Sequence, residues 1–173
     1  ENYDLRLEWF PRPGEVFAVS WFLKNIKDPI EKETFGYIQE DYLLTVNYPK
    51  GTVRGIELEG RKSLDFLPGP FQYFSLGANY TYIDATVELP ENMRDSLAFH
   101  NMPMNKRRME GQPEYLMNFN VTFHLEETGT RAAFFYTRTG EMLKSGAAVG
   151  DLAATPNIFV LPYAVVNFSV SQT

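Results

Sequence analysis

Sulfur and imidazole groups gather in one polar segment of this chain. The segment contains Met93, His100, Met102, Met104 and Met109 within a short stretch. Thioether and imidazole ligands suit soft metal ions such as Cu(I). Methionine also fills irregular gaps in packed loops, and the spacing here follows no metal-ligand pattern. We therefore expect these methionines to pack where the segment folds, and we expect neither a metal site nor a cofactor.

Catalytic residues are scarce. His100 and His124 are the only two histidines, and the chain has no cysteine. Neither histidine belongs to a nucleophile or zinc motif, and no glycine-rich phosphate loop is present. The sequence therefore predicts a protein that is not an enzyme.

Three adjacent basic residues, Lys106, Arg107 and Arg108, follow the methionine-rich stretch. Such a run could attract an anionic ligand or phosphate groups. A solvated surface is the simpler interpretation of three basic residues in a polar segment. We keep the three residues as ligand candidates beside that interpretation.

The composition limits the classes of partner. The chain has 173 residues, a net charge of -6 and 15% aromatic residues. An acidic balance argues against a nucleic-acid partner. No apolar run approaches the roughly 18 residues of a transmembrane helix. Membrane-spanning β-strands escape that criterion, because their lipid-facing and lumen-facing residues alternate.

Short and long connections alternate along the chain. The short ones are Pro11–Gly14, Leu67–Pro70 and Glu126–Gly129, and the long ones are Asp28–Lys50, Leu89–Pro113 and Lys144–Leu161. Outer-membrane barrels have short periplasmic turns and longer extracellular loops. The alternation therefore favours a sheet that crosses a bilayer, with its long loops outside the cell.

About seven runs have the two-residue period of a β-strand. The apolar side of the pattern comprises Tyr3, Leu5, Leu7, Trp9, Phe17, Val19, Trp21, Ile56, Leu58, Leu76, Tyr80, Met117, Phe119, Val166 and Phe168. Phe22 is an apolar exception on the polar side, and the run Arg131–Thr139 is aromatic on both sides. We predict an all-β antiparallel up-and-down meander that forms part of a large transmembrane barrel.

Charged and amide side chains occupy the other parity of these strands. They are Asp4, Arg6, Glu8, Glu57, Glu59, Arg61, Asn79, Asn118 and Asn120. A lysine or arginine facing lipid at the midplane costs about 2–4 kcal/mol, so these residues are expected to face the lumen.

A soluble antiparallel sheet with one face in water would also alternate. Such a sheet needs a second apolar layer, and no segment of helical period is evident to supply one. The sequence therefore favours the membrane barrel over a soluble β-sheet binding module.

Several stretches resemble the later barrel strands of TonB-dependent outer-membrane receptors. They are Asn2–Pro11, Ser20–Glu31, Arg54–Glu59, Gly77–Asp84, Gly111–Asn118 and Tyr136–Glu141, in the order that the family uses. The resemblance implies a barrel of roughly 22 strands whose lumen is closed by an N-terminal plug. It also implies a bacterial outer-membrane location, coupling to periplasmic TonB through the plug, and contact with membrane lipid and lipopolysaccharide.

The resemblance gives the long loops a possible ligand. Tyr37, Tyr42 and Tyr48 could stack on a sugar, an aromatic siderophore or a corrin, or could instead anchor their loop. The polar strand residues would line the lumen or contact the plug.

We expect residues 1–173 to be part of one barrel domain, with the plug and the closing strands outside this sequence. The implied function is energy-coupled uptake of a scarce solute of the ferric siderophore, corrinoid or oligosaccharide class. A non-energised channel and an adhesin-like barrel are the alternatives in the same membrane.

Overall fold

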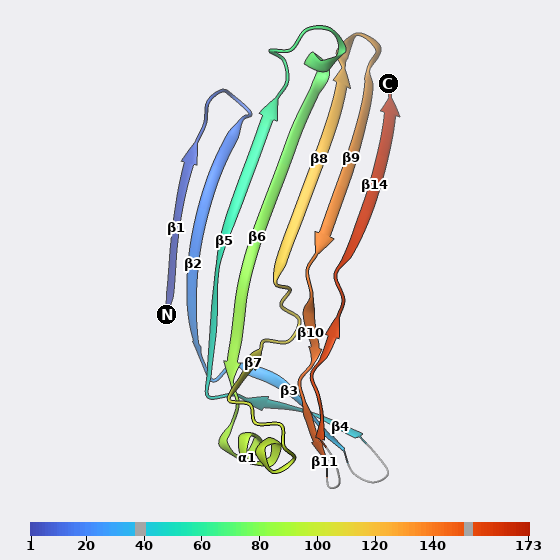
Figure 1. Ribbon diagram of the computed structural model, residues 1–173. Coiled ribbons are helices and arrows are strands. Elements are labelled where there is room, and N and C mark those ends of the chain that lie inside the picture. Colours follow the sequence, from blue (N-terminus) through green and yellow to red (C-terminus); the bar gives the residue numbers. More distant parts are fainter. Residues whose placement is uncertain (37–40, 151–153) are drawn as a thin grey trace.

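Seven long strands form a single-layered antiparallel sheet (Figure 1). The computed structural model describes residues 1–36, 41–150 and 154–173. The strands are β1 (Asn2–Trp9), β2 (Val16–Lys27), β5 (Lys50–Ser63), β6 (Phe74–Glu88), β8 (Tyr115–Leu125), β9 (Thr130–Thr139) and β14 (Tyr163–Gln172). They follow one another in this order across the sheet. The predicted up-and-down meander is confirmed.

Short connections lie at one end of the sheet and long ones at the other (Figure 1). Two short connections contain 3₁₀ turns, η1 (Gly69–Tyr73) and η2 (Glu126–Thr128). Gly129 ends η2 with φ of 64°, a left-handed conformation that glycine adopts without strain. The turn β5–β6 is longer than predicted, because β5 ends at Ser63 and leaves Leu64 and Phe66 in the connection.

The long loops contain further elements. They are β3 (Ile30–Gly36), β4 (Asp41–Asn47), α1 (Glu91–Phe99), β7 (Lys106–Arg108), β10 (Met142–Ser145), β11 (Ala148–Gly150), β12 (Ala154–Thr155) and β13 (Ile158–Val160). The helix α1 corrects the expectation of no helical segment. Its two buried residues, Met93 and Leu97, are four apart and therefore share one face, but nine residues are too few to display a clear period.

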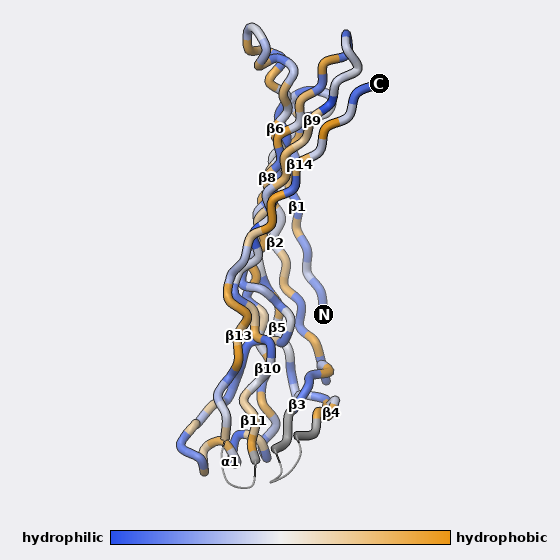
Figure 2. The backbone as a smooth tube through the Cα atoms, turned by 90° about the vertical axis from the view of Figure 1, so that its right-hand side faces the viewer, coloured by the Kyte–Doolittle hydropathy of each residue, from blue (hydrophilic) through white to orange (hydrophobic). Residues whose placement is uncertain are grey.

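The three long loops fold together at the end of the sheet (Figure 2). β3 and β4 pair with each other, and β11 of the third loop pairs in parallel with β3 of the first. The buried core lies here and consists of Tyr48, Val87, Leu89, Met93, Leu97 and Ala147, with Met102, Met104 and Met109 packed against it. The expectation that the methionines pack within the folded loop is confirmed.

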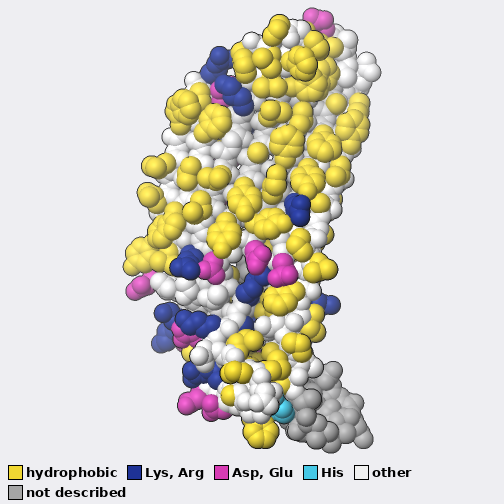
Figure 3. Space-filling view, viewed as in Figure 1, with side chains coloured by type: hydrophobic (Ala, Val, Ile, Leu, Met, Phe, Trp, Pro, Cys, Tyr) yellow, Lys and Arg dark blue, Asp and Glu magenta, His cyan; other side chains and the backbone are white. Residues whose placement is uncertain are grey.

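The apolar side of the sheet is exposed. Large apolar side chains such as Leu5, Leu7, Ile56 and Phe168 are 59%, 68%, 47% and 71% exposed. Figure 3 shows a broad apolar surface on this face, with charged side chains beyond it toward both ends. The ion pairs there include Arg12–Asp65 and Lys62–Glu15 at the turn end, and Arg54–Asp84, Lys106–Glu88, Arg108–Glu114 and Arg108–Glu141 at the loop end.

The part of the chain that the structure describes contains no helix with the length and apolar content needed to cross a membrane. Residues 1–36, 41–150 and 154–173 also bring together no group of three or more histidine, aspartate or glutamate side chains that could hold a metal ion.

Candidate functional site

The predicted polar residues share one face of the sheet. Glu8, Ala18, Glu59, Asn79 and Asn118 are cross-strand partners in one row across β1, β2, β5, β6 and β8. Because side chains alternate along a strand, residues paired directly across strands point to the same side. Asp4 and Arg6 of β1, Glu57 and Arg61 of β5, and Asn120 of β8 have the same parity as this row.

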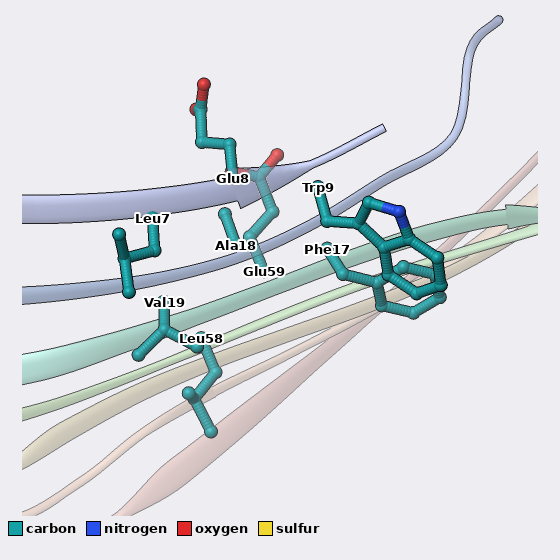
Figure 4. A pocket seen from close by; sticks show the side chains of 8 residues that line it. All are labelled: Leu7, Glu8, Trp9, Phe17, Ala18, Val19, Leu58 and Glu59. Carbon is teal, nitrogen blue, oxygen red and sulfur yellow. The ribbon is translucent and has the colours of Figure 1, made fainter. Parts of the chain in front are cut away.

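Figure 4 shows the two faces at close range. Glu8 and Glu59 point to one side of β1 and β5, whereas Leu7 and Leu58 point to the other. Trp9 lies beside the Phe17 ring of the neighbouring strand, with ring centroids 5.8 Å apart. The shallow hollow at this place is lined mostly by apolar side chains, so we do not regard it as a solute site.

Arg6 organises the polar face at the first three strands. Its guanidinium binds Glu8 Oε1 at 2.6 Å and Glu59 Oε2 at 2.7 Å, and donates to Ser20 Oγ at 3.0 Å. All four side chains lie on the surface of the isolated sheet. Solvent screens exposed pairs of this kind, so the network can exchange partners easily.

Amide groups continue the polar face. Asn118 Nδ2 donates to Asn79 Oδ1 at 2.7 Å, and Thr137 Oγ1 donates to Asn118 Oδ1 at 2.8 Å. Asn120 lies over Gly77, where an added Cβ would approach its amide to 2.6 Å. The polar face therefore carries two hydrogen-bonded groups, one that spans β1, β2 and β5 and another that spans β6, β8 and β9.

Arg107 lies at the centre of the folded loops, and its side chain is 0% exposed. The guanidinium binds Glu31 Oε2 at 2.9 Å and Glu110 Oε1 at 3.6 Å. It also donates to the Tyr48 hydroxyl at 3.2 Å and lies 4.9 Å from the centre of the Tyr48 ring. Arg107 of β7 pairs with Val87 of β6. Val87 has the same parity as Asn79 in β6, so Arg107 is on the polar side of the sheet.

Burial shifts the pKa values of three groups near Arg107. It raises the pKa of Glu31 and of Glu33 above the usual carboxylate range, while the positive charge of Arg107 opposes both shifts. Burial also raises the pKa of the Tyr48 hydroxyl to about 12. The carboxylate oxygen Oε1 of Glu33 is buried without a hydrogen-bond partner among the described residues.

A pocket of about 390 Å³ opens beside these groups. Its walls include Ile30, Glu31, Lys32, Glu110, Leu143 and Lys144, which come from different loops or from strands that extend from them. Lys32 and Lys144 are exposed. The register of β10 with β13 shifts between Leu143 and Ser145, so Lys144 occupies a β-bulge. Bulges often redirect a side chain beside a functional site.

The loop residues predicted to bind a ligand separate into distinct groups. Tyr37 lies outside the described residues, as does the side chain of Tyr42. Lys106 is exposed and pairs with Glu88 at 3.2 Å, and Arg108 binds Glu114 and Glu141. Neither Lys106 nor Arg108 lines the pocket above.

Tyr48 and Arg107 do not have the ligand-binding position that the sequence suggested. Tyr48 is 0% exposed and the Arg107 side chain is 0% exposed, so neither can touch a solute in this conformation. The two residues anchor the loops, which for Tyr48 is the alternative left open by the sequence. Their burial follows from packing between distant segments, because Arg107 and Tyr48 are 59 positions apart.

The residues that surround Arg107 and the pocket were not predicted from the sequence. A signal was present in the run Glu31-Lys32-Glu33 within the first loop. In a strand, this alternation places both carboxylates on one face and the lysine on the other. The structure has that arrangement, with Glu31 and Glu33 buried and Lys32 exposed.

Comparisons with known proteins agree with this architecture. The model of the family described as "TonB dependent receptor-like, beta-barrel" matches residues 1–173. No curated protein sequence matches the chain.

Among solved structures, the chain is similar to the ferric enterobactin receptor PfeA of Pseudomonas aeruginosa. A crystal structure of one PfeA mutant has a TM-score of 0.58 and 18% identity, covering 96% of this chain and 22% of that one. Another PfeA mutant, in complex with enterobactin, has the same TM-score and identity over 99% of this chain and 23% of that one. At this identity the likeness concerns the fold, and this chain spans less than a quarter of the PfeA length.

Seven alternating strands, short turns at one end, folded loops at the other and a family match over the whole sequence lead to one conclusion. The chain belongs to the TonB-dependent receptor β-barrel family.

Proposed function

We propose that this chain forms part of the wall and mouth of an outer-membrane receptor that takes up a scarce solute. The observation that carries the proposal is the division of the seven-stranded sheet into a mainly polar and a mainly apolar face. In a bilayer the apolar face contacts lipid, and the polar face lines the lumen. The charged side chains at both ends of the apolar face then meet the two membrane surfaces, including lipopolysaccharide on the outer side.

The polar face suits a removable plug. Arg6, Glu8 and Glu59 form an ion network that water can reach, so a plug can replace these partners and release them again. Each exchange has a small net free energy, because water competes for the same hydrogen bonds. Family membership supports the same arrangement, in which periplasmic TonB acts on the plug to open the lumen.

The solute is proposed by class. The solved neighbours are described as ferric enterobactin receptors, which favours a ferric siderophore over a corrinoid or an oligosaccharide. The folded loops supply a pocket with exposed lysines, Lys32 and Lys144, over an apolar floor that includes Leu143.

The facing of the strands is tested with spin labels in the full-length receptor. Labels at Leu5, Leu58 and Phe119 are expected to be accessible to oxygen and shielded from polar relaxants. Labels at Arg6, Glu57 and Asn118 are expected to behave in the opposite way. Accessibility that does not depend on residue parity would contradict the barrel orientation.

Energy coupling is tested by uptake of a labelled ferric siderophore in cells that express the receptor, with and without TonB. We expect uptake above background only when TonB is present. Equal uptake in both strains would favour a non-energised channel. Absence of both binding and uptake for siderophore, corrinoid and oligosaccharide probes would favour an adhesin-like barrel.

A further inference from the structure

The buried Arg107 contacts all three long loops. The first loop provides Glu31 and Tyr48, and the second provides Arg107 itself and Glu110. The third loop provides Gly146, whose backbone N–H donates to Glu110 Oε1 at 2.9 Å. A Cβ added at Gly146 would lie 2.7 Å from Arg107 Nε, so the loop backbone passes directly over the guanidinium.

The contacts of Arg107 with Glu31 and Glu110 support the wall of the pocket. Glu31 and Glu110 line the pocket and also bind Arg107, while Leu143 and Lys144 line it where the third loop begins. Arg107 is itself absent from the lining and has 0% side-chain exposure. It therefore fixes two wall residues without reaching the space that they enclose.

We propose that Arg107 is a positioning residue of this pocket. Arg107 joins the three long loops into one unit, which we call the clasp, so that the pocket exists before a solute arrives. Its importance for uptake rests on the function proposed above. A pre-formed pocket avoids the free energy of ordering loops during binding. The clasp depends on charge, because removal of one partner from a buried ion pair leaves its partners uncompensated.

The charges around the clasp make this role distinguishable from simple space filling. Three carboxylates, Glu31, Glu33 and Glu110, and the hydroxyl of Tyr48 face a single guanidinium. Without Arg107 the buried Glu31 and Glu33 would have to be protonated for the loops to stay packed. Loops that lack this cation should therefore order at mildly acidic pH and separate as the pH rises.

The experiment measures distances by pulsed dipolar EPR in the full-length receptor in detergent, without solute. One pair of nitroxides is placed at Leu44 in the first loop and Ile158 in the third, which are 50% and 53% exposed. A second pair, at Leu58 and Val166, reports on the strands of the sheet. The variant Arg107→Met is compared with Arg94→Met, the same change at an exposed position of the same loop.

Arg107→Met is expected to broaden the loop-pair distance distribution roughly twofold at about pH 8 and to restore its native width at about pH 5. The distance distribution of the sheet pair should not change. The loop-pair distribution of Arg94→Met should match that of the wild type at both pH values. If the loop-pair distance distribution of Arg107→Met stayed narrow at about pH 8, or stayed broad at about pH 5, the proposal would be overturned. Broadening of the sheet pair would overturn it too, because Arg107 would then act on the barrel.

A second variant keeps the cation and changes only the charge balance. Burial raises the pKa of Glu33, so the folded loops bind more protons than separated loops do and lose stability as the pH rises through the raised pKa. Glu33→Gln removes this dependence and should keep the loop pair narrow at both pH values. A broader distribution in Glu33→Gln than in wild type would contradict the clasp. All these distances are independent of whether the receptor transports a siderophore.

Discussion

Phe22 and Gly55 explain the one apolar interruption that the sequence shows on the polar face. Phe22 pairs with Gly55 across β2 and β5, and a Cβ at Gly55 would lie 2.5 Å from the ring. It would also lie 2.1 Å from the carbonyl oxygen of Tyr82. The glycine therefore gives the Phe22 ring room to lie over the neighbouring strand, where it covers backbone that would otherwise have no side chain above it.

Gly55→Ala is expected to destabilise the barrel by about 1–3 kcal/mol, because neither the ring nor the Tyr82 carbonyl can move away without strain. Gly60→Ala is the matched control in the same strand, since the nearest atom to its added Cβ is 3.6 Å away in Phe17. Urea unfolding of the refolded receptor in detergent measures both. Equal midpoints for the two variants would show that the close approach at Gly55 does not constrain the sheet.

Tyr48 gives a prediction at alkaline pH. Its pKa is about 12 in the folded loops, compared with about 10 for an ordinary tyrosine. The folded loops therefore favour the protonated hydroxyl, and this contribution is complete below about pH 10 and lost as the pH rises through about 12. Ultraviolet difference titration of wild type against Tyr48→Phe should isolate one phenol that ionises near the higher value. A difference centred near pH 10 would contradict the buried position.

At the scale of the elements, pairing assigns faces that alternation leaves ambiguous. β9 is aromatic on both parities, but its register with β8 aligns Phe134 with Val121 and Tyr136 with Phe119. Those two aromatics therefore belong to the apolar face, and Phe135 belongs to the polar face opposite Asn120. The sequence of β9 allows either parity to lie on the apolar face, and pairing with β8 determines which one does.

The sorting of connections predicts which residues are reachable from outside the cell. Cysteines introduced at Thr45 and Phe99, in the first and second long loops, should react with a membrane-impermeant maleimide on intact cells. Cysteines at Arg12 and Phe71, in the short turns, should react only after the outer membrane is permeabilised. All four positions are exposed, so accessibility on the isolated surface does not separate them. Equal labelling on intact cells would refute the orientation.

At the scale of the whole molecule, the two outermost strands are open. Every residue of β1 and β14 is exposed, and each strand has one hydrogen-bonded neighbour. Each unpaired backbone group costs several kcal/mol in hydrocarbon, so this sheet requires further strands at both edges in a membrane. Its exposed apolar face, which includes Leu5, Leu7, Trp9, Val166 and Phe168, is also a surface that soluble monomers rarely expose.

Residues 1–173 expressed alone should therefore not form a stable soluble monomer. We expect inclusion bodies, or a sheet that persists only with detergent or with the remainder of the barrel. Size-exclusion chromatography and thermal melting without detergent test this expectation. A monodisperse monomer with a cooperative melt would show that the sheet is stable in water and that its apolar face has another use.

The sequence by itself determined the seven strands, the two faces of the strands other than β9, and the order of short and long connections. These features depend on local rules, because side chains alternate along every strand and turn residues act within a few positions. Only the tertiary structure decided the interior of the loops, including the helix α1, the parallel pairing of β11 with β3 and the burial of Tyr48 and Arg107. Arg107 reaches the carbonyl of Lys32 across 75 positions and Tyr48 across 59, and no local pattern encodes contacts over such separations. A basic residue in a polar loop has the same sequence signal whether water or buried carboxylates surround it, so the fold had to assign its role.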